Sequence, residues 1–548
     1  MELAAEPSPT QPPSPEPAPP PASPAVSPAA SPPEPSTAPA AREAGPTVVL
    51  VAVLLAVAVV PMSISGTGVA LPRIGDDTGA SLPALQWVVN AFNLAFACLT
   101  LAWGSLADII GRVRAFALGA AVFAAASLAS AATSDIVLLD IARAVAGVGG
   151  AAILSSGSAL LAGVFHGAAR TRAFALFGTV AGIALALGPT VSGQLVQTLG
   201  WRWIFVLHAL ALLVVLALTP AVARRDTSVP RGGRVDLAGT ALFVASLAVA
   251  MTAIVQASRW GWGSAATLGM LGVSLLLLAA FAAVERRVTA PMLDLAVLRN
   301  RRFLGVCLVP VAGSFGFVTL LTYLPTYLTT VTERDSATAG WVMLLLTSPV
   351  LLCPVLAGRL VTAGVPSTAL LLGSLVCLVA GDAALLLSGP EVTTALLAVP
   401  LLLVGVGFGL AAGLVDAQAL EMVPTHQAGM AAGFLNTLRL GSEAVAVAVY
   451  ASLLATLIRV RITDGVAADS AGANVPTGAD PAALAEHAAA GDVAGATADG
   501  GTTAELTRLL VSGYDGAFHT MAWLLAAVCA ALTVLIAVLL RPERPARP

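Results

Sequence analysis

Long apolar stretches alternate with short polar segments over most of this 548-residue chain. Fourteen stretches between Thr47 and Leu540 are long enough to cross a bilayer, because about 20 apolar residues in a helix span a hydrocarbon core roughly 30 Å thick. A helix also satisfies its own backbone hydrogen-bonding groups in lipid. The pattern therefore predicts an all-α integral membrane protein with fourteen transmembrane helices. The expected spans are 47–72, 85–107, 114–132, 136–164, 172–197, 201–222, 236–257, 265–284, 303–330, 338–361, 366–388, 393–416, 427–456 and 517–540.

Three segments lie outside this pattern. Residues 1–46 are rich in Pro, Ala and Ser and contain almost no large apolar residue, so we expect a disordered tail. Residues 457–516 form the one long external connection, rich in Ala, Gly and Asp; we interpret it as a mobile surface loop, either an unselected linker or a substrate-recognition element. Residues 541–548 form a short C-terminal tail. An even number of spans places both termini on one side.

The arginines indicate which side that is. All 27 basic residues are arginine. With both termini in the cytoplasm, 18 arginines lie in tails or loops on that side and seven outside, while Arg143 and Arg439 lie within spans. This bias follows the positive-inside rule. We therefore expect a multi-pass protein of the plasma membrane with both termini cytoplasmic.

Composition excludes several other classes. The chain is 57% hydrophobic and only 10% charged, far from the quarter or so that is charged in soluble domains. Its basic residues form no patch with interleaved aromatics, which argues against nucleic-acid binding. Without lysine there is no Gly-x-x-x-x-Gly-Lys-Ser/Thr loop for ATP, and the five cysteines have no metal-ligand spacing. We expect no metal and no cofactor, and energy from an ion gradient.

A short internal repeat indicates how the spans are grouped. Gly104-Ser-Leu at the end of the second span is echoed by Gly358-Arg-Leu at the end of the tenth. Parallel repetition of this kind is typical of transporters in which two bundles rock against each other. It predicts an N-terminal six-helix bundle at 47–222, two inserted linker helices within 223–302, and a C-terminal six-helix bundle at 303–540.

The turn after the second span carries the most specific motif. Gly104, Asp108, Gly111 and Arg112 occur in the pattern Gly-x-Leu-Ala-Asp-x-x-Gly-Arg. The glycines allow a tight turn between helices, and the two charges can form a latch that is closed in one bundle arrangement and open in the other. The motif resembles that of the fourteen-span drug/proton antiporter branch of the major facilitator superfamily, although Ile109 replaces the usual basic residue. The alternative is a loop cap that also serves as a topology signal.

A second motif lies in the fifth span. Gly178, Gly182, Gly188, Pro189 and Gly193 resemble the antiporter motif of the same family. Small residues at these spacings let two helices approach closely, and the proline bends the span. Glycine-mediated packing alone is the simpler interpretation. The resemblance implies export rather than uptake.

The fourth span resembles a family element that is linked to proton coupling. Arg143 occupies the position of the family's arginine, and a charge near mid-bilayer costs roughly 3 kcal/mol or more. Asp140, one turn earlier, is its local candidate partner. The family's carboxylate in the first span is replaced here by Ser63. If proton coupling is retained, another acid must therefore carry the proton.

Three acids within spans are candidates for this role: Asp140, Asp382 and Glu443. Glu443 follows Arg439 by four residues, on the same helical face, so the two can pair. The pair either exchanges a proton during transport or is a permanent ion pair that only packs the bundle. Asp382 is expected near the outer membrane edge, where hydration would make it uninformative.

Polar residues within apolar spans are candidates for the wall of a substrate cavity. Gln86, Asn90 and Asn93 form a stripe at positions i, i+4 and i+7 of the second span, and Tyr323 and Asn436 are weaker additions. The alternative role of the stripe is hydrogen bonding between helices. A large apolar cavity with few acids suits amphiphilic, neutral or weakly charged organic compounds.

The function that these features favour is proton-coupled efflux of amphiphilic small organic compounds by alternating access. We expect antibiotics or secondary metabolites as substrates and a monomeric transporter, and the Arg-, Ala-, Gly- and Pro-rich composition is typical of a GC-rich bacterium. An uptake symporter or a non-exporting sensor is the alternative. A membrane-embedded enzyme is remote, because no nucleophile elbow or metal-ligand spacing occurs.

Overall fold

The computed structural model describes residues 44–225, 235–288, 291–332, 334–469, 484–485, 487–488 and 504–541. Within these ranges the chain is helical with short turns, and no strand occurs. The predicted tails at 1–46 and 541–548 lie almost wholly outside the described residues, as does the middle of the predicted loop 457–516.

Fourteen helical segments of the described chain are long and apolar enough to cross a membrane, which confirms the fourteen predicted spans. The helices are α1 (Ala44–Thr78), α2 (Leu82–Ile110), α3 (Arg112–Ala132), α4 (Ile136–Val164), α5 (Gly167–Thr198), α6 (Arg202–Ala223), α7 (Leu237–Trp260), α8 (Ala265–Glu285), α9 (Arg301–Gly313), α10 (Thr319–Thr330), α11 (Ser336–Thr362), α12 (Ser367–Ala384), α13 (Thr394–Ala411), α14 (Leu414–Glu421), α15 (Ala428–Asp469) and α18 (Ala504–Leu539). A π-helical turn, η2 (Ser314–Val318), joins α9 to α10, so these three elements make one span.

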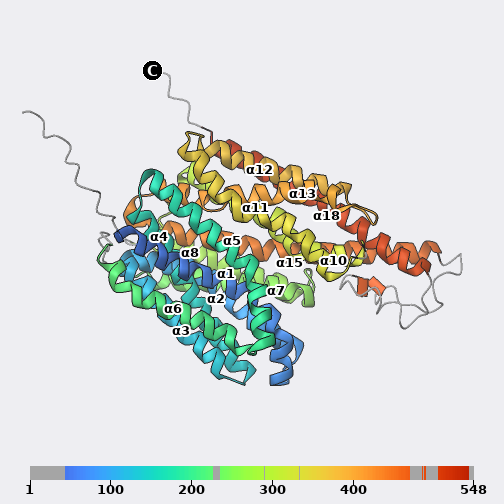
Figure 1. Cartoon of the computed structure of the whole chain (residues 1–548), viewed down its shortest axis with the longest axis horizontal. Coiled ribbons are helices and arrows are strands. Elements are labelled where there is room, and N and C mark those ends of the chain that lie inside the picture. Colours follow the sequence, from blue (N-terminus) through green and yellow to red (C-terminus); the bar gives the residue numbers. More distant parts are fainter. Residues whose placement is uncertain are drawn as a thin grey trace, which may run out of the picture. The chain divides into compact units, whose positions relative to one another are not determined.

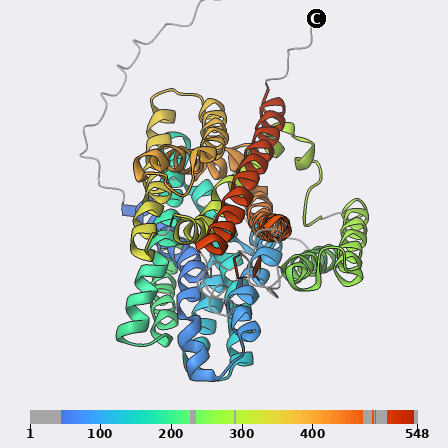
Figure 2. The ribbon, with the colours of Figure 1, turned by 90° about the vertical axis from the view of Figure 1, so that its right-hand side faces the viewer.

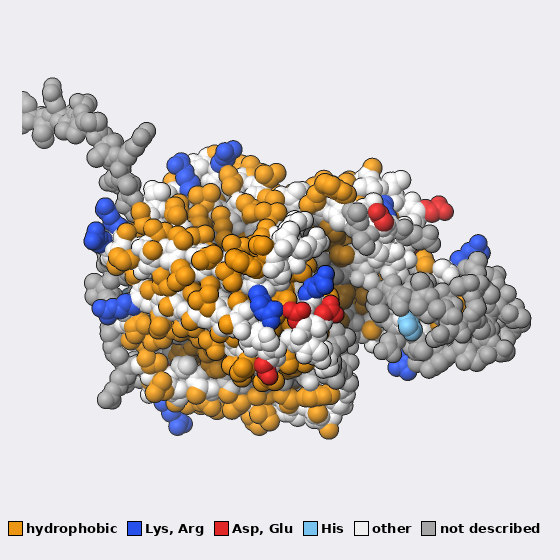
Figure 3. Space-filling model, turned by 60° about the horizontal axis from the view of Figure 1, so that its bottom comes forward, with side chains coloured by type: hydrophobic (Ala, Val, Ile, Leu, Met, Phe, Trp, Pro, Cys, Tyr) orange, Lys and Arg blue, Asp and Glu red, His pale blue; other side chains and the backbone are white. Residues whose placement is uncertain are grey.

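The helices pack as two groups with one pair beside them. Helices α1 to α6 contact one another, as do α9 to α18 (Figure 1). The green pair α7 and α8 lies to one side in Figure 2 and contacts the rest mainly through α2 and α15. Figure 3 shows a face covered largely by hydrophobic side chains, with few charged groups. Such an exposed apolar surface is what a lipid-facing protein requires.

The two groups meet mainly along two helix pairs, α2 with α15 and α5 with α11, and α4 also contacts α15. Glycines permit both approaches. A Cβ at Gly104 of α2 would lie 2.2 Å from the carbonyl oxygen of Gly429, and a Cβ at Gly358 of α11 would lie 3.0 Å from the Cβ of Ala175 on α5. The two glycines of the predicted repeat therefore occupy equivalent places in the two interfaces.

The twelfth span is not the continuous helix 393–416 that the hydropathy predicted. It breaks at Ala412–Gly413, and the short helix α14 follows. Gly413 has a φ of +76°, and a Cβ there would lie 2.1 Å from the carbonyl oxygen of Phe174. Only glycine fits both the left-handed backbone and this contact with α5.

The flanks of the predicted loop 457–516 are also helical. Helix α15 continues to Asp469 and α18 already begins at Ala504. Ile458 and Ile462 of α15, and Leu506 and Leu510 of α18, are buried, with at most 1% exposed. Their spacing of four residues gives each extension one apolar face, which is sufficient for the two helices to pack.

Candidate functional site

The α2–α3 turn connects the two groups of helices through Asp108. Its carboxylate accepts hydrogen bonds from the backbone N–H groups of Gly429 (3.0 Å) and Met430 (2.8 Å). These amides open α15, so an acid on α2 caps a helix of the other group and complements the positive end of its dipole. The side chain is 5% exposed. The sequence identified Asp108 but not these partners, which lie more than 300 residues away.

Arg112 completes this contact. Its guanidinium lies 3.6 Å from the Asp108 carboxylate and donates to the carbonyl oxygen of Ala159 on α4 at 3.1 Å. It also donates to the carbonyl oxygen of Thr425, just before α15. Gly111, with a φ of +99°, forms the whole turn between the two charges. The four predicted latch residues therefore lie together, and Asp108 and Arg112 both bind the start of α15.

The antiporter motif lies on α5, and its glycines face two directions. A Cβ at Gly178 would lie 2.9 Å from the backbone of Ala412, and one at Gly182 would lie 3.0 Å from Val350 of α11. Both positions therefore allow contact with the other group of helices. The other motif residues, Gly188, Pro189 and Gly193, lie farther along α5. Gly188 packs against α1, whereas a Cβ at Gly193 would make only an ordinary contact, at 3.8 Å from Val69.

This difference gives a paired prediction. Substituting Gly178 by Ala is expected to lower the free energy of unfolding by about 1–3 kcal/mol and to impair transport, because the added methyl group would push α5 away from the α13–α14 break. Gly193→Ala is the matched control on the same helix, and we expect it to be tolerated. Thermal unfolding and substrate efflux at equal membrane levels measure both effects. Equal behaviour of the two variants would contradict the assigned interface.

Arg143 is buried in the N-terminal group without a carboxylate partner. It is 1% exposed and donates to the Val88 carbonyl oxygen at 3.1 Å and to Ser63 Oγ at 2.9 Å. Its guanidinium lies 4.4 Å from the centre of the Phe92 ring, within cation–π distance. The predicted pairing with Asp140 is wrong for this structure: no ion pair joins the two described residues, and the hydrogen-bond acceptors of the guanidinium come from α1 and α2 instead.

A cavity of about 210 Å³ lies between the two groups of helices. Residues of α1, α2, α4 and α5 line one part, and residues of α9, α11, α12, α13, α14 and α15 line the rest. Its walls are mostly apolar. The polar side chains among the lining residues are Ser374, Asp416, Arg439 and Glu443.

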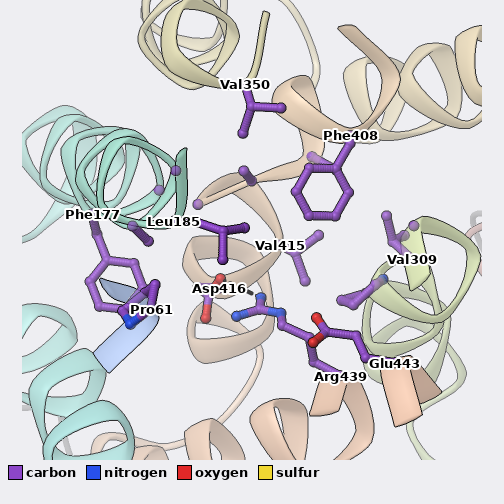
Figure 4. Close-up of a pocket in the computed structure, with 18 of the residues that line it drawn as sticks. Pro61, Phe177, Leu185, Val309, Val350, Phe408, Val415, Asp416, Arg439 and Glu443 are labelled. Carbon is purple, nitrogen blue, oxygen red and sulfur yellow. Dashed lines mark hydrogen bonds and ion pairs between the residues drawn. The ribbon is translucent and has the colours of Figure 1, made fainter. Parts of the chain in front are cut away.

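Three charged residues gather at one end of this cavity (Figure 4). Arg439 donates to the Asp416 carboxylate at 2.8 Å and to the Asn436 side-chain oxygen at 2.9 Å. Glu443 lies on the other side of the arginine, and its carboxyl group makes no hydrogen bond to any residue that the structure describes (Figure 4). The predicted Arg439–Glu443 ion pair is therefore wrong in detail, because Asp416 is the direct partner.

Asp416 was missing from the predicted site. It is 1% exposed and lies in the first turn of α14, where a carboxylate is favoured by the helix dipole. The predicted span 393–416 ends at Asp416, so the hydropathy pattern indicates a residue at the membrane boundary rather than an acid within the membrane. The Ala-Ala-Gly sequence at 411–413 is the feature of the sequence that indicates the break in the helix just before Asp416.

The other predicted residues are not among those that line the cavity. None of the proposed wall residues, Gln86, Asn90, Asn93, Tyr323 and Asn436, lines it. The α2 residue in its wall is Phe96, one turn beyond the stripe. Asp382 is fully buried on α12, although we expected it to be hydrated. It lies near the end of its span, but Gly316 of η2 and Cys529 of α18 lie against it.

The fold and site define a membrane transporter built from two helical groups around a central cavity. Comparison with known sequences gives the family: the profile of the Major Facilitator Superfamily matches residues 53–447. The chain belongs to this superfamily.

Several relatives are resistance and export proteins. The chain is 38% identical over 279 residues to puromycin resistance protein pur8 of Streptomyces alboniger, which covers 50% of this chain and 55% of that protein. It is 31% identical over 287 residues to the tetracenomycin C resistance and export protein of Streptomyces glaucescens, covering 52% of each. The matched region thus spans about half the length of these relatives.

A solved structure supports the fold. The crystal structure of the human organic anion transporter MFSD10 aligns with a TM-score of 0.51 over 88% of this chain and 98% of that one, at 16% sequence identity. At this identity the likeness concerns the arrangement of the helices alone.

Proposed function

We propose that the protein exports amphiphilic small organic compounds, in exchange for protons, from the cytoplasm across the plasma membrane. The observation that carries this proposal is the apolar cavity between the two groups of helices with Asp416, Arg439 and Glu443 at one end. The resistance proteins among its relatives support export, and antibiotics or secondary metabolites are the substrate class. The arginine bias supports a cytoplasmic location of both termini in this proposal.

The cavity can bind such compounds because most of its wall is apolar. Side chains such as Phe177, Leu185 and Phe408 offer surface to a hydrophobic ring system (Figure 4). Burying apolar surface contributes about 25 cal/mol per Å², so affinity does not depend on one specific contact. A cavity of this type tolerates a range of substrates.

Glu443 is our candidate for the exchanged proton. The charge of Arg439 is already matched by Asp416, so an ionised Glu443 would be an unbalanced charge in the membrane, which costs roughly 3 kcal/mol or more. When the cavity is closed and dry, the neutral acid is favoured. When the cavity opens to water on the cytoplasmic side, ionisation is no longer opposed. The proton that Glu443 bound from the outside is then released to the cytoplasm.

Alternating access requires a contact that forms in one state and breaks in the other. The bonds of Asp108 and Arg112 to the start of α15 join the two groups of helices at the predicted cytoplasmic end. In the proposed cycle they hold this end closed while the substrate leaves outward. Their rupture opens the cavity to the cytoplasm.

Directional flux tests this function. Inside-out membrane vesicles with an acidic interior are prepared from cells that express the protein. We then follow the uptake of puromycin, tetracenomycin C and a panel of dyes and biocides. We expect accumulation of at least one compound that disappears when nigericin collapses the pH gradient. Accumulation that is instead found in right-side-out vesicles with an acid exterior would indicate an uptake symporter.

A further inference from the structure

Asp382 is a carboxyl group for which the proposed cycle has no role. It lies on α12 and is 0% exposed. Among the described acids it alone has both carboxyl oxygens buried without a hydrogen bond from a nitrogen or oxygen donor, and the neighbouring Cys529 thiol is only a weak donor. A buried polar group without a partner costs free energy, and a buried charge costs far more. The group is therefore held as the neutral acid in this conformation.

The groups that face this carboxyl come from several elements. Helix α18 brings the Cys529 thiol, which donates its own hydrogen bond to the Ala312 carbonyl oxygen at 3.6 Å. Helix α15 brings Tyr450, whose buried hydroxyl also has no partner among the described residues. Helix α13 and the η2 turn carry no titratable residue. Asp416 of α14 is turned toward Arg439. Among the residues that the structure describes, none forms an ion pair with Asp382.

The π-helical turn η2 packs directly against this acid. A Cβ at Gly316 would lie 2.8 Å from Asp382 Oδ2 and 2.7 Å from Leu378 Cγ. The absence of a side chain at this position is what leaves room for the carboxyl group. Single π-helical turns interrupt the regular hydrogen-bond ladder and occur frequently at functional sites.

The same turn also borders the substrate cavity. Gly313, just before it, and Leu378, one turn before Asp382 on α12, both line the cavity. Ser314, the first residue of the turn, lies with its hydroxyl 2.9 Å from that of Ser442, the neighbour of Glu443. One irregular element therefore contacts both the buried acid and the helix segment that carries the proposed proton carrier.

We propose that Asp382 is a second proton-binding group, distinct from the Asp416–Arg439–Glu443 cluster and exposed to cavity water when the η2 turn rearranges. The inference rests on the proposed proton-driven export. Water reaching the carboxyl group removes the cost of its charge, so the proton is released, and reclosure of the turn requires that a proton has been taken up again. Asp382 thus couples the movement of α9–α10 to protonation.

Labelling of the wild-type protein tests whether Asp382 binds and releases a proton. Dicyclohexylcarbodiimide adds to protonated carboxyl groups in apolar surroundings, and mass spectrometry of peptides locates the adduct. With full-length protein in liposomes, we expect the Asp382 adduct to decrease as pH rises and to change when a transported compound is present. An adduct that is absent at every pH, or that is independent of both pH and substrate, would overturn the proposal.

Transport by two variants gives the second test. For Asp382→Asn, a neutral isostere, we expect proton-driven efflux to fall about tenfold while substrate exchange without a gradient is retained. Gly316→Ala should likewise lower proton-driven efflux and retain substrate exchange. Gly373→Ala is the control on α12, since a Cβ there would have no neighbour within 4 Å, and it should change neither activity. If efflux by Asp382→Asn kept the pH dependence of the wild type, Asp382 would be a permanently neutral acid with a structural role only. If the wild type itself shows no proton-driven flux, the proposed function fails, and the labelling alone decides on Asp382.

Discussion

Asp108→Asn is expected to reduce efflux to background while the protein remains in the membrane. Asparagine removes the negative charge at the start of α15 and the ion pair with Arg112, and it leaves one of the two amides, that of Gly429 or Met430, without its acceptor. Charge-assisted bonds of this kind contribute about 1.5–3 kcal/mol each. Loss of one shifts a two-state equilibrium by roughly tenfold to a hundredfold.

Growth inhibition and vesicle efflux at matched membrane levels measure this loss. Arg114→Gln is the matched control, since it removes an exposed charge two residues beyond Arg112 on α3. We expect this control to transport normally. Wild-type efflux by Asp108→Asn would mean that the contact is a helix cap without a part in the cycle.

Glu443→Gln should have the second large effect, which is confined to proton-driven transport. Glutamine keeps the size of the side chain but cannot exchange a proton, so efflux against a gradient should cease while substrate binding persists. By contrast, Asp416→Asn leaves the charge of Arg439 unmatched. Removal of one partner of a buried pair costs about 3–5 kcal/mol, so this variant should unfold at a lower temperature.

Two measurements separate these roles: the thermal unfolding temperature of purified protein and the pH-driven flux in vesicles. Glu421→Gln, at the exposed end of α14, is the control and should leave both unchanged. Normal gradient-driven efflux by Glu443→Gln would exclude this residue as an essential carrier. A lowered unfolding temperature for Glu443→Gln would instead indicate a structural role.

The spans were predictable because crossing a bilayer is a local property of the chain. Each helix must be apolar over its own length, so hydropathy locates it without reference to its neighbours. The helix 136–164 was predicted to the residue. Hydropathy could not identify the break at Gly413 or the helical extensions beyond 456, since both depend on contacts between helices.

The partners of the charged residues were less predictable than the residues themselves. Arg143 and Arg439 each had an acid within four positions on the same helix, and neither uses it as its direct partner. A neighbour in sequence is only one of several groups that tertiary packing offers. The closest acceptor comes from α1 for Arg143 and from α14 for Arg439.

The position of α7 has a consequence for entry from lipid. This helix contacts both α2 and α15, and Phe243 of α7 lies in one apolar cluster with Leu101 of α2 and Met430 of α15. It therefore shields one of the two seams between the bundles from the acyl chains. The described contacts of α7 and α8 leave the α5–α11 seam uncovered. A hydrophobic compound dissolved in the bilayer should accordingly find the two sides of the transporter unequal, because α7 stands between the acyl chains and the α2–α15 seam.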